Sequence, residues 1–249
     1  MVIFLLVDSH CHLDWFKKPR ETMEKARARG VTRVLSSATN NASIEKNLSL
    51  SKEVEGVLCT IGLHPGEVLK MPDGEIDRGF GLVEKNISEA NGVGEVGLDF
   101  KYAQATGERR LQEKVFRGFI SLAIEHDKPV IVHARYAESR CLDILEEMKA
   151  RKVLMHWFTN SRKTSSRAVS LGYCISCGPT IFSDEQSAQV VGQIPLSSLL
   201  LETDAPVSFS GKQSEPSWIP LVRDRVAEIK GVSSEEVEEA AEKNFNALL

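Results

Sequence analysis

The sequence predicts an α/β protein with the fold of a (β/α)8 TIM barrel, as a single domain over residues 1–249. Three observations support this prediction. Short apolar runs rich in Val, Ile and Leu recur along the chain, segments with helical spacing and charged faces lie between them, and no linker rich in Gly, Ser or Pro divides the chain. A length of 249 residues, 42% of them hydrophobic, suits one barrel of this kind.

Eight apolar runs are the expected strands. Their apolar residues are continuous rather than alternating, which is typical of strands in a parallel sheet that helices cover on its outer face. Eight units of strand followed by helix favour closure into a barrel over an open doubly wound sheet. The expected strands are Ile3–Val7, Arg33–Ser37, Val57–Gly62, Val93–Leu98, Pro129–Val132, Lys152–Met155, Gly172–Ser176 and Ser198–Leu201.

Helices are expected between the strands and at the end of the chain. A capping box of Ser233 and Glu236 marks the start of the last helix. Two stretches, Lys70–Arg78 and Ser208–Pro216, have the composition of long loops. The helices expected between strands are Pro19–Arg29, Asn41–Val54, Phe80–Ala90, Glu108–His126, Glu138–Arg151, Arg162–Leu171 and, more weakly patterned, Ser183–Gln193.

Charge and cysteine content narrow the possible classes of protein. The formal net charge of -4 gives no basic field for nucleic acid or membrane, so a polyanionic substrate would have to be held by local charge. Five scattered cysteines do not suggest a disulfide framework. The apolar opening, Met1–Val7, lacks a basic leader and a cleavage site and is too short to span a bilayer. We therefore expect a cytoplasmic protein, with a monomer as the default state.

Five of the six histidines come at the ends of expected strands. In a (β/α)8 barrel these ends share one face, where catalytic groups gather, so residues far apart in the sequence are expected to converge there. A histidine alone in such a place is more often structural than functional, but the barrel itself does not require imidazoles at its rim. The five histidines are His10, His12, His64, His133 and His156.

Two acidic residues join the histidines at this face. Glu95 lies on the fourth expected strand, and Asp204 follows the eighth. Imidazole and carboxylate together are the ligands of a catalytic divalent ion. In an extended strand, residues two positions apart point to the same side, so both His10 and His12 can hold one ion.

This geometry predicts a centre with two metal ions. His10, His12 and Asp204 are expected on the first ion, and His133 and His156 on the second. Glu95 is expected to bridge the ions. Glu95 and Asp204 are expected to be catalytic residues. A metal lowers the pKa of a bound water from about 15.7 to about 7, a larger effect than a general base alone supplies.

Six sequence blocks, in order, resemble the TatD-type metal-dependent deoxyribonucleases of the amidohydrolase superfamily. The resemblance spans nearly the whole chain and implies the same six metal-site residues. It further implies that His64 and Arg135 meet a phosphate or another anionic group, that Glu202 supports Asp204 from behind, and that Asp204 takes a proton from the attacking water. The blocks are Asp8–Asp14, Gly62–Pro65, Gly94–Asp99, Pro129–Arg135, His156–Phe158 and Leu201–Pro206.

The chain departs from the family pattern at positions that concern the substrate. The family usually has His-Ser-Arg where this chain has His133-Ala-Arg135, and Ser/Thr-Gly where this chain has Thr159-Asn160. It usually has Thr-Phe-Lys in the block where this chain reads Thr180-Ile-Phe-Ser183. The missing lysine removes an expected phosphate contact, so these changes bear on the substrate rather than on hydrolysis.

Three functions are therefore open from the sequence. The first is a deoxyribonuclease that cleaves DNA phosphodiester bonds, from a 3′ end or on single strands, with Mg²⁺ or Mn²⁺ in the site and Zn²⁺ also compatible with the ligands. The second is a metal-dependent hydrolase of a different ester or amide, such as a D-aminoacyl-tRNA or a small molecule. The third is a barrel that binds metal without catalysis.

Overall fold

Eight parallel strands lie side by side in the order in which they follow one another along the chain. The computed structural model describes residues 5–159 and 161–249, so Ile3 and Phe4 of the first expected strand, and Asn160, lie outside the described residues. The predicted (β/α)8 barrel is confirmed. Its strands are β1 (Leu6–Cys11), β2 (Val31–Ser37), β3 (Val57–Ile61), β4 (Gly92–Asp99), β5 (Val130–Arg135), β6 (Val153–Met155), β7 (Cys174–Cys177) and β8 (Leu199–Leu201).

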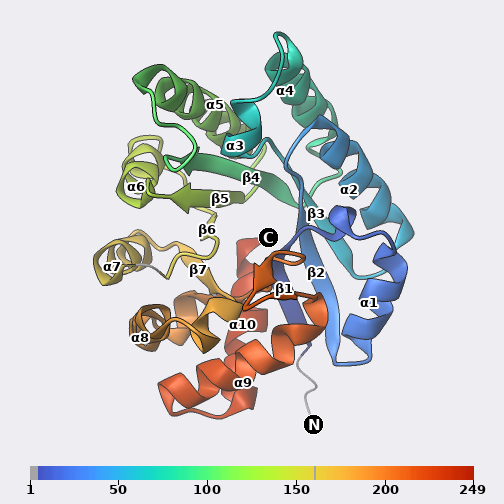
Figure 1. Ribbon diagram of the computed structural model, residues 1–249, viewed down its shortest axis with the longest axis vertical. Coiled ribbons are helices and arrows are strands. Elements are labelled where there is room, and N and C mark those ends of the chain that lie inside the picture. The colour runs from blue at the N-terminus through green and yellow to red at the C-terminus, as the bar shows by residue number, and fades with distance from the viewer. Residues whose placement is uncertain (1–4, 160) are drawn as a thin grey trace.

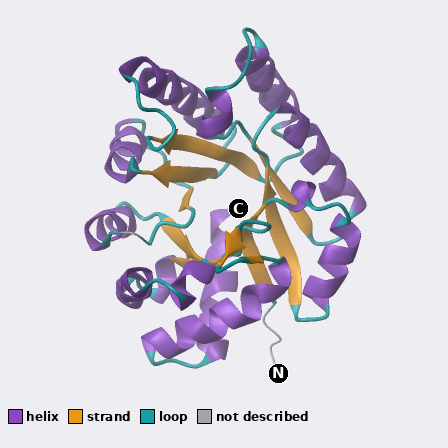
Figure 2. Ribbon diagram, viewed as in Figure 1, coloured by secondary structure: helices purple, strands orange, loops and turns teal. Residues whose placement is uncertain are grey.

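The helices form an outer ring around the strands (Figure 1), and the same division into an inner sheet and outer helices is visible in Figure 2. Each expected helix is present with shifts of a few residues at its ends, and short 3-10 turns occur at four places in the described residues. The helices are α1 (Pro19–Arg27), α2 (Asn41–Glu53), α3 (Pro65–Val68), α4 (Glu75–Asn86), α5 (Thr106–Glu125), α6 (Glu138–Glu147), α7 (Arg162–Ser170), α8 (Glu185–Gln193), α9 (Ile219–Lys230) and α10 (Ser234–Leu248).

The barrel closes where the segment after β8 meets β1. The Asp204 amide donates to the carbonyl of His10 at 3.0 Å, and the His12 amide donates to the carbonyl of Ala205 at 2.6 Å. Below them, the Ser9 hydroxyl donates to the carbonyl of Leu201 at 2.9 Å. These bonds bring two segments nearly 200 residues apart in sequence into contact, with Asp204 directly beside the His10–His12 segment.

A separate apolar cluster fills the opposite end of the barrel. It combines one residue from each of five strands with Phe245 and Leu248 of α10. Four of the five strand residues come before a site residue on, or just after, the same strand, so α10 lies across the amino ends of the strands, as its position behind the centre of Figure 1 shows. The strand residues are Val7, Leu35, Ile131, Leu154 and Leu200.

Several element boundaries differ from the sequence-based prediction. β1 continues to Cys11, because pairing with β2 extends beyond the apolar run. The loop expected over Lys70–Arg78 is shorter, since α4 begins at Glu75 and places Ile76 against the core. The loop expected over Ser208–Pro216 contains two short antiparallel strands, β9 (Ser208–Phe209) and β10 (Lys212–Gln213).

The predicted start of α10 is confirmed. The Ser233 hydroxyl accepts a bond from the Glu236 amide, and the Glu236 carboxylate accepts one from the Ser233 amide. These bonds satisfy amide groups that the first turn of a helix leaves without partners. Among the described residues, no helix is both long enough and apolar enough to cross a membrane.

Candidate metal centre

A cleft of about 820 Å³ opens at the carboxyl ends of the strands. Its walls include His12, His64, Glu95, His133, His156 and Asp204, which come from six separate strands or the segments just after them. His10 is fully buried beside them. The structure therefore brings all six predicted metal-site residues, and His64, into one place.

Glu95 on β4 stands between two pairs of histidines. Its Oε1 atom lies 2.9 Å from His133 Nδ1 and 2.9 Å from His156 Nε2. Its Oε2 atom lies 3.5 Å from His12 Nε2 and 3.6 Å from His10 Nε2. One carboxylate thus presents a different oxygen to each pair, which is the arrangement that a bridging ligand requires.

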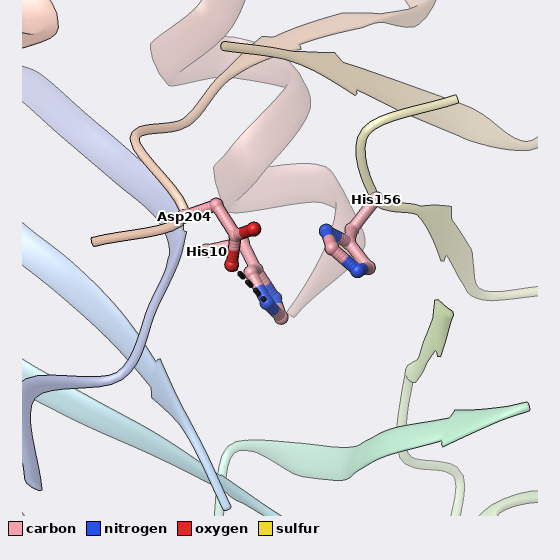
Figure 3. Close-up of side chains that lie close together, drawn as sticks. All are labelled: His10, His156 and Asp204. Carbon is pink, nitrogen blue, oxygen red and sulfur yellow. Dashed lines mark ion pairs between the residues drawn. The ribbon is translucent and has the colours of Figure 1, made fainter. Parts of the chain in front are cut away.

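Asp204 faces the His10 and His12 pair. Its Oδ1 atom lies 3.4 Å from His12 Nε2 and 3.6 Å from His10 Nε2. Figure 3 shows the side chains of His10, His156 and Asp204 directed into one space from separate elements. Asp204 has a φ of +48°, a left-handed conformation that is uncommon outside glycine and is found at functional sites.

The donor atoms fit a divalent ion. His10 Nε2 and Glu95 Oε2 are buried without a hydrogen-bond partner in the described part of the chain, although a buried polar atom is normally satisfied. Ligands that bind a metal at about 2.1 Å are roughly 3.0–3.4 Å from one another. His133 Nδ1 and His156 Nε2 are 3.4 Å apart, within this range.

Within the part of the chain that the structure describes, three overlapping groups of side chains have ligand atoms close enough together to share an ion. All contain histidine and a carboxylate, and the histidines are buried in the first two groups and half-buried in the third. The third includes His64, for which the family resemblance implied a contact with the substrate. The groups are His10, His156 and Asp204; His10, His12 and Glu95; and His64, Glu95 and His133.

The carboxylates of the cluster are held in their charged form. Burial alone would raise the pKa of Glu95 and of Asp204, but the surrounding histidines lower both values below the ordinary range. Burial disfavours the charged form of His12, but the Asp204 and Glu95 carboxylates outweigh it and raise its pKa to about 9. The cluster therefore needs positive charge, either as protons on the rings or as a cation between them.

His64 is held as a neutral ring whose Nε2 carries the proton. Its Nδ1 accepts a hydrogen bond from the Gly66 amide at 3.0 Å, so Nε2 is the donor, and it lies 3.8 Å from Glu95 Oε1. Burial and the neighbouring His133 lower the pKa of His64 to about 3. Arg135 also lines the cleft, and among the described residues no carboxylate forms an ion pair with it.

Glu202 contacts a different residue from the one expected. The family resemblance implied that Glu202 lies behind Asp204, but the Glu202 Oε2 atom lies 3.5 Å from His156 Nδ1 and accepts a bond from the Ser176 hydroxyl at 2.6 Å. Asp204 instead faces His10 and His12, so the two carboxylates have different neighbours. Glu202 therefore supports a histidine of the cluster.

Two buried aspartates complete the site and were not among the predicted residues. Asp99 Oδ2 lies 3.1 Å from His133 Nε2, and Asp99 Oδ1 accepts the amides of Lys101 and Tyr102. Asp8 accepts bonds from the amide and hydroxyl of Thr203, next to Asp204. Both end or occupy strands at the same face, which is the one sequence signal that could have identified them.

Comparison with known proteins agrees with this geometry. The family model described as TatD related DNase matches residues 7–249. The human protein named deoxyribonuclease TATDN3 is 34% identical over 96% of this chain and 92% of its own length. The Escherichia coli K12 protein named uncharacterized metal-dependent hydrolase YcfH is 34% identical over 98% of this chain and 95% of its own length.

A solved structure shows the same fold. The crystal structure of YJJV, a TatD homologue from Escherichia coli K12, superimposes with a TM-score of 0.88 and 27% sequence identity. The match covers 98% of this chain and 97% of that chain.

Proposed function

The chain belongs to the TatD-related DNase family and is a metal-dependent hydrolase, and from this premise we propose that it cleaves phosphodiester bonds of DNA, removing nucleotides from the 3′ end of single strands. The observation that carries the proposal is Glu95, whose two oxygens each face one pair of histidines at the base of an open cleft. That arrangement suits two ions spanning one phosphate.

The ligand atoms divide into two sets. His10, His12 and Asp204 would hold one divalent ion, His133 and His156 would hold a second, and Glu95 would contact both. Bound divalent ions supply a nucleophile at neutral pH by lowering the pKa of water and offset the charge that develops on phosphate, for which Mg²⁺ or Mn²⁺ is well suited and Zn²⁺ is also compatible with these ligands.

Asp204 is the residue that we propose moves the proton. Its lowered pKa keeps the carboxylate able to accept a proton from the attacking water. Oδ1 faces His10 and His12, while Oδ2 forms no ion pair within the described residues. Oδ2 is therefore the atom that would take the proton and return it to the leaving 3′ oxygen.

His64 and Arg135 are the residues that we propose bind the phosphate. The proton on His64 Nε2 points toward the cluster, where it can be donated to a phosphate oxygen. The Arg135 guanidinium, which lacks an ion-pair partner in the described part of the chain, can pair with the same group from the wall of the cleft.

Degradation of a 5′-labelled single-stranded oligodeoxynucleotide tests the proposal. With Mg²⁺ or Mn²⁺, we expect a ladder that shortens from the 3′ end, and we expect EDTA to stop it. Asp204→Asn should lower the rate by roughly 10²- to 10⁴-fold, the usual contribution of a positioned proton-transfer group. Asp143→Asn, which changes a surface carboxylate paired with Arg167, should leave the rate unchanged.

A second candidate function is hydrolysis of a different ester or amide, such as a D-aminoacyl-tRNA or a small molecule. Three acidic residues, Glu67, Glu138 and Asp184, also line the cleft, and they disfavour a long polyanion. If the protein binds metal but leaves DNA intact, this second function replaces the first. If neither substrate class is hydrolysed, the third candidate, a metal-binding barrel without catalysis, stands.

A further inference from the structure

Aromatic side chains surround the mouth of the cleft. Trp15 follows β1, Tyr102 follows β4, Tyr136 follows β5 and Trp157 follows β6, and all four line the cleft. The chain has 3 tryptophans and 3 tyrosines in total, so most of them lie at this one site. Such a concentration is not a general property of a chain in which only 6% of residues are aromatic.

Three of these rings are exposed rather than packed in the core. The exposed fractions are 51% for Trp15, 54% for Tyr102 and 72% for Tyr136. Large apolar side chains left exposed together at a cleft are typical of a binding site. Because these rings are not buried in the core, a role in stabilising the fold does not explain why they are there.

Trp15 presents one free face directly beside the metal centre. Its indole stacks on the His12 ring, with centroids 4.5 Å apart and an angle of 16° between the planes. Because half of the side chain is still exposed, the face away from His12 is open to a ligand. A planar group stacked on that face would be separated from His12, a proposed metal ligand, by the indole ring alone.

The backbone holds two of the other rings in an unusual conformation. Tyr136 has a φ of +55° and Trp157 a φ of +45°, in the left-handed region that non-glycine residues seldom adopt. Trp157 also packs against Phe209 of β9, with ring centroids 5.1 Å apart. Strained residues of this kind persist where the surrounding structure fixes them, and they cluster at binding sites.

The rings lie on opposite sides of the metal centre. In a closed ring of eight strands, β1 and β5 are diametrically opposed, so Trp15 stands across the cleft from Tyr136, with Tyr102 on the neighbouring strand to Tyr136. Arg135, next to Tyr136 in the chain, adds a positive charge to the wall of the cleft. A ligand with planar apolar groups on both sides of an anionic centre matches this arrangement.

We propose that Trp15, Tyr102, Tyr136 and Trp157 bind unpaired nucleobases on both sides of the phosphate at the metal centre. This inference rests on the proposed cleavage of DNA and assigns residues to its single-strand preference. A base within a duplex is stacked on its neighbours and has no free face, so only an unpaired strand can use these rings. Each stacked base is expected to strengthen binding about 5- to 150-fold.

Binding of two labelled strands that differ only in their bases tests the inference. One is a phosphorothioate-linked oligothymidylate, which resists cleavage, and the other is an abasic strand with the same length and linkages. Fluorescence anisotropy with Mn²⁺ present gives the affinity for each. We expect the native protein to prefer the strand with bases at least 10-fold. Trp15→Ala and Tyr136→Ala should each reduce that ratio about 5-fold or more.

Conservative and distant variants serve as controls. Trp15→Phe and Tyr136→Phe keep a ring and should retain most of the preference. Ile124→Ala removes a side chain of similar exposure near the end of α5, at the opposite end of the barrel, and should behave like the native protein.

Two results would overturn the inference: equal affinity of the native protein for the two strands, or an unchanged ratio in both alanine variants. The cleavage assay separates this inference from the proposed function. Cleavage of DNA with equal affinity for both strands would contradict the inference alone. A preference for bases that depends on Trp15 and Tyr136, without any cleavage, would support the inference and contradict only the proposed function.

Discussion

At the scale of single residues, the site depends on how each histidine is oriented by its second contact. His133 directs Nδ1 toward Glu95 and has Asp99 at its Nε2. His12 directs Nε2 toward Glu95 and Asp204 and has the carbonyl of Ser37 at its Nδ1, 2.8 Å away. An acceptor at the far nitrogen holds the proton there, so the lone pair of the near nitrogen faces the centre.

The contact between Asp99 and His133 gives a prediction about metal affinity. Asp99→Asn removes the carboxylate that orients the ring, and we expect metal affinity to fall about 10- to 100-fold, as for other residues that orient metal ligands. Isothermal titration of the metal-free protein with Mn²⁺ or Zn²⁺ measures this. Asp143→Asn controls for the change of charge, and equal affinities in Asp99→Asn and the native protein would contradict the role.

Much of the candidate site could be predicted at this scale. His10, His12, Glu95, His133, His156 and Asp204 were identified from residue type and position at strand ends, and the structure brings them together. Their metal-binding roles stay a prediction.

Residue positions alone could not identify the contacts of Asp99 or the partner of Glu202. Those depend on the direction of individual side chains. The left-handed φ of Asp204 likewise leaves no trace in the residue types.

At the scale of elements, β4 is shaped by glycines that allow a close approach to β5. A Cβ atom on Gly94 would lie 2.6 Å from Cβ of Ile131, and one on Gly97 would lie 2.0 Å from the carbonyl oxygen of His133. Gly97 also has a φ of +144°, which side chains rarely adopt. Between these two glycines lies Glu95, so their close packing fixes the height of the carboxylate in the barrel.

Gly97→Ala should therefore destabilise both the sheet and the site. We expect a loss on the order of 3 kcal/mol in the free energy of unfolding, because the backbone of β5 must move. Denaturation with urea measures it. Gly81→Ala, on α4 with nothing near its new methyl group, should be neutral or up to about 1 kcal/mol more stable. Similar stabilities for the two variants would contradict the close-packing account.

The strands and helices were largely predictable, because continuous apolar runs and helical spacing reflect burial that the barrel imposes on every unit. The errors occurred where tertiary contacts set the boundary. β1 extends to Cys11 because β2 continues beside it. α4 begins before the expected residue because Ile76 packs against the core. The β9 and β10 hairpin has no apolar run at all, and its four residues are half-buried or exposed.

At the scale of the whole molecule, the two ends of the barrel have different roles. Apolar side chains and α10 fill the amino ends of the strands, while buried charge occupies the carboxyl ends. Mutual repulsion among the carboxylates opposes folding unless a cation is present. So do buried atoms without a hydrogen-bond partner among the described residues, such as His10 Nε2 and Glu95 Oε2. The barrel's stability is thus expected to depend on metal.

This dependence can be measured as a shift in Tm. At a metal concentration 100 times the Kd, binding stabilises the native state by about 2.7 kcal/mol, which corresponds to roughly 2–4 °C for each kcal/mol in a chain of this size. We expect Mn²⁺ or Zn²⁺ to raise Tm by several degrees over the EDTA-treated protein. Asp204→Asn should show a smaller rise, and an equal Tm with and without metal would argue against a site in this cluster.

The central claim, that this cluster holds two ions bridged by Glu95, is tested most directly by anomalous diffraction from crystals grown with Mn²⁺. We predict two peaks in the anomalous difference map, one among His10, His12 and Asp204 and one between His133 and His156, each beside a different oxygen of Glu95. A map without peaks in the cluster, or with a single peak that Glu95 does not contact, would contradict it.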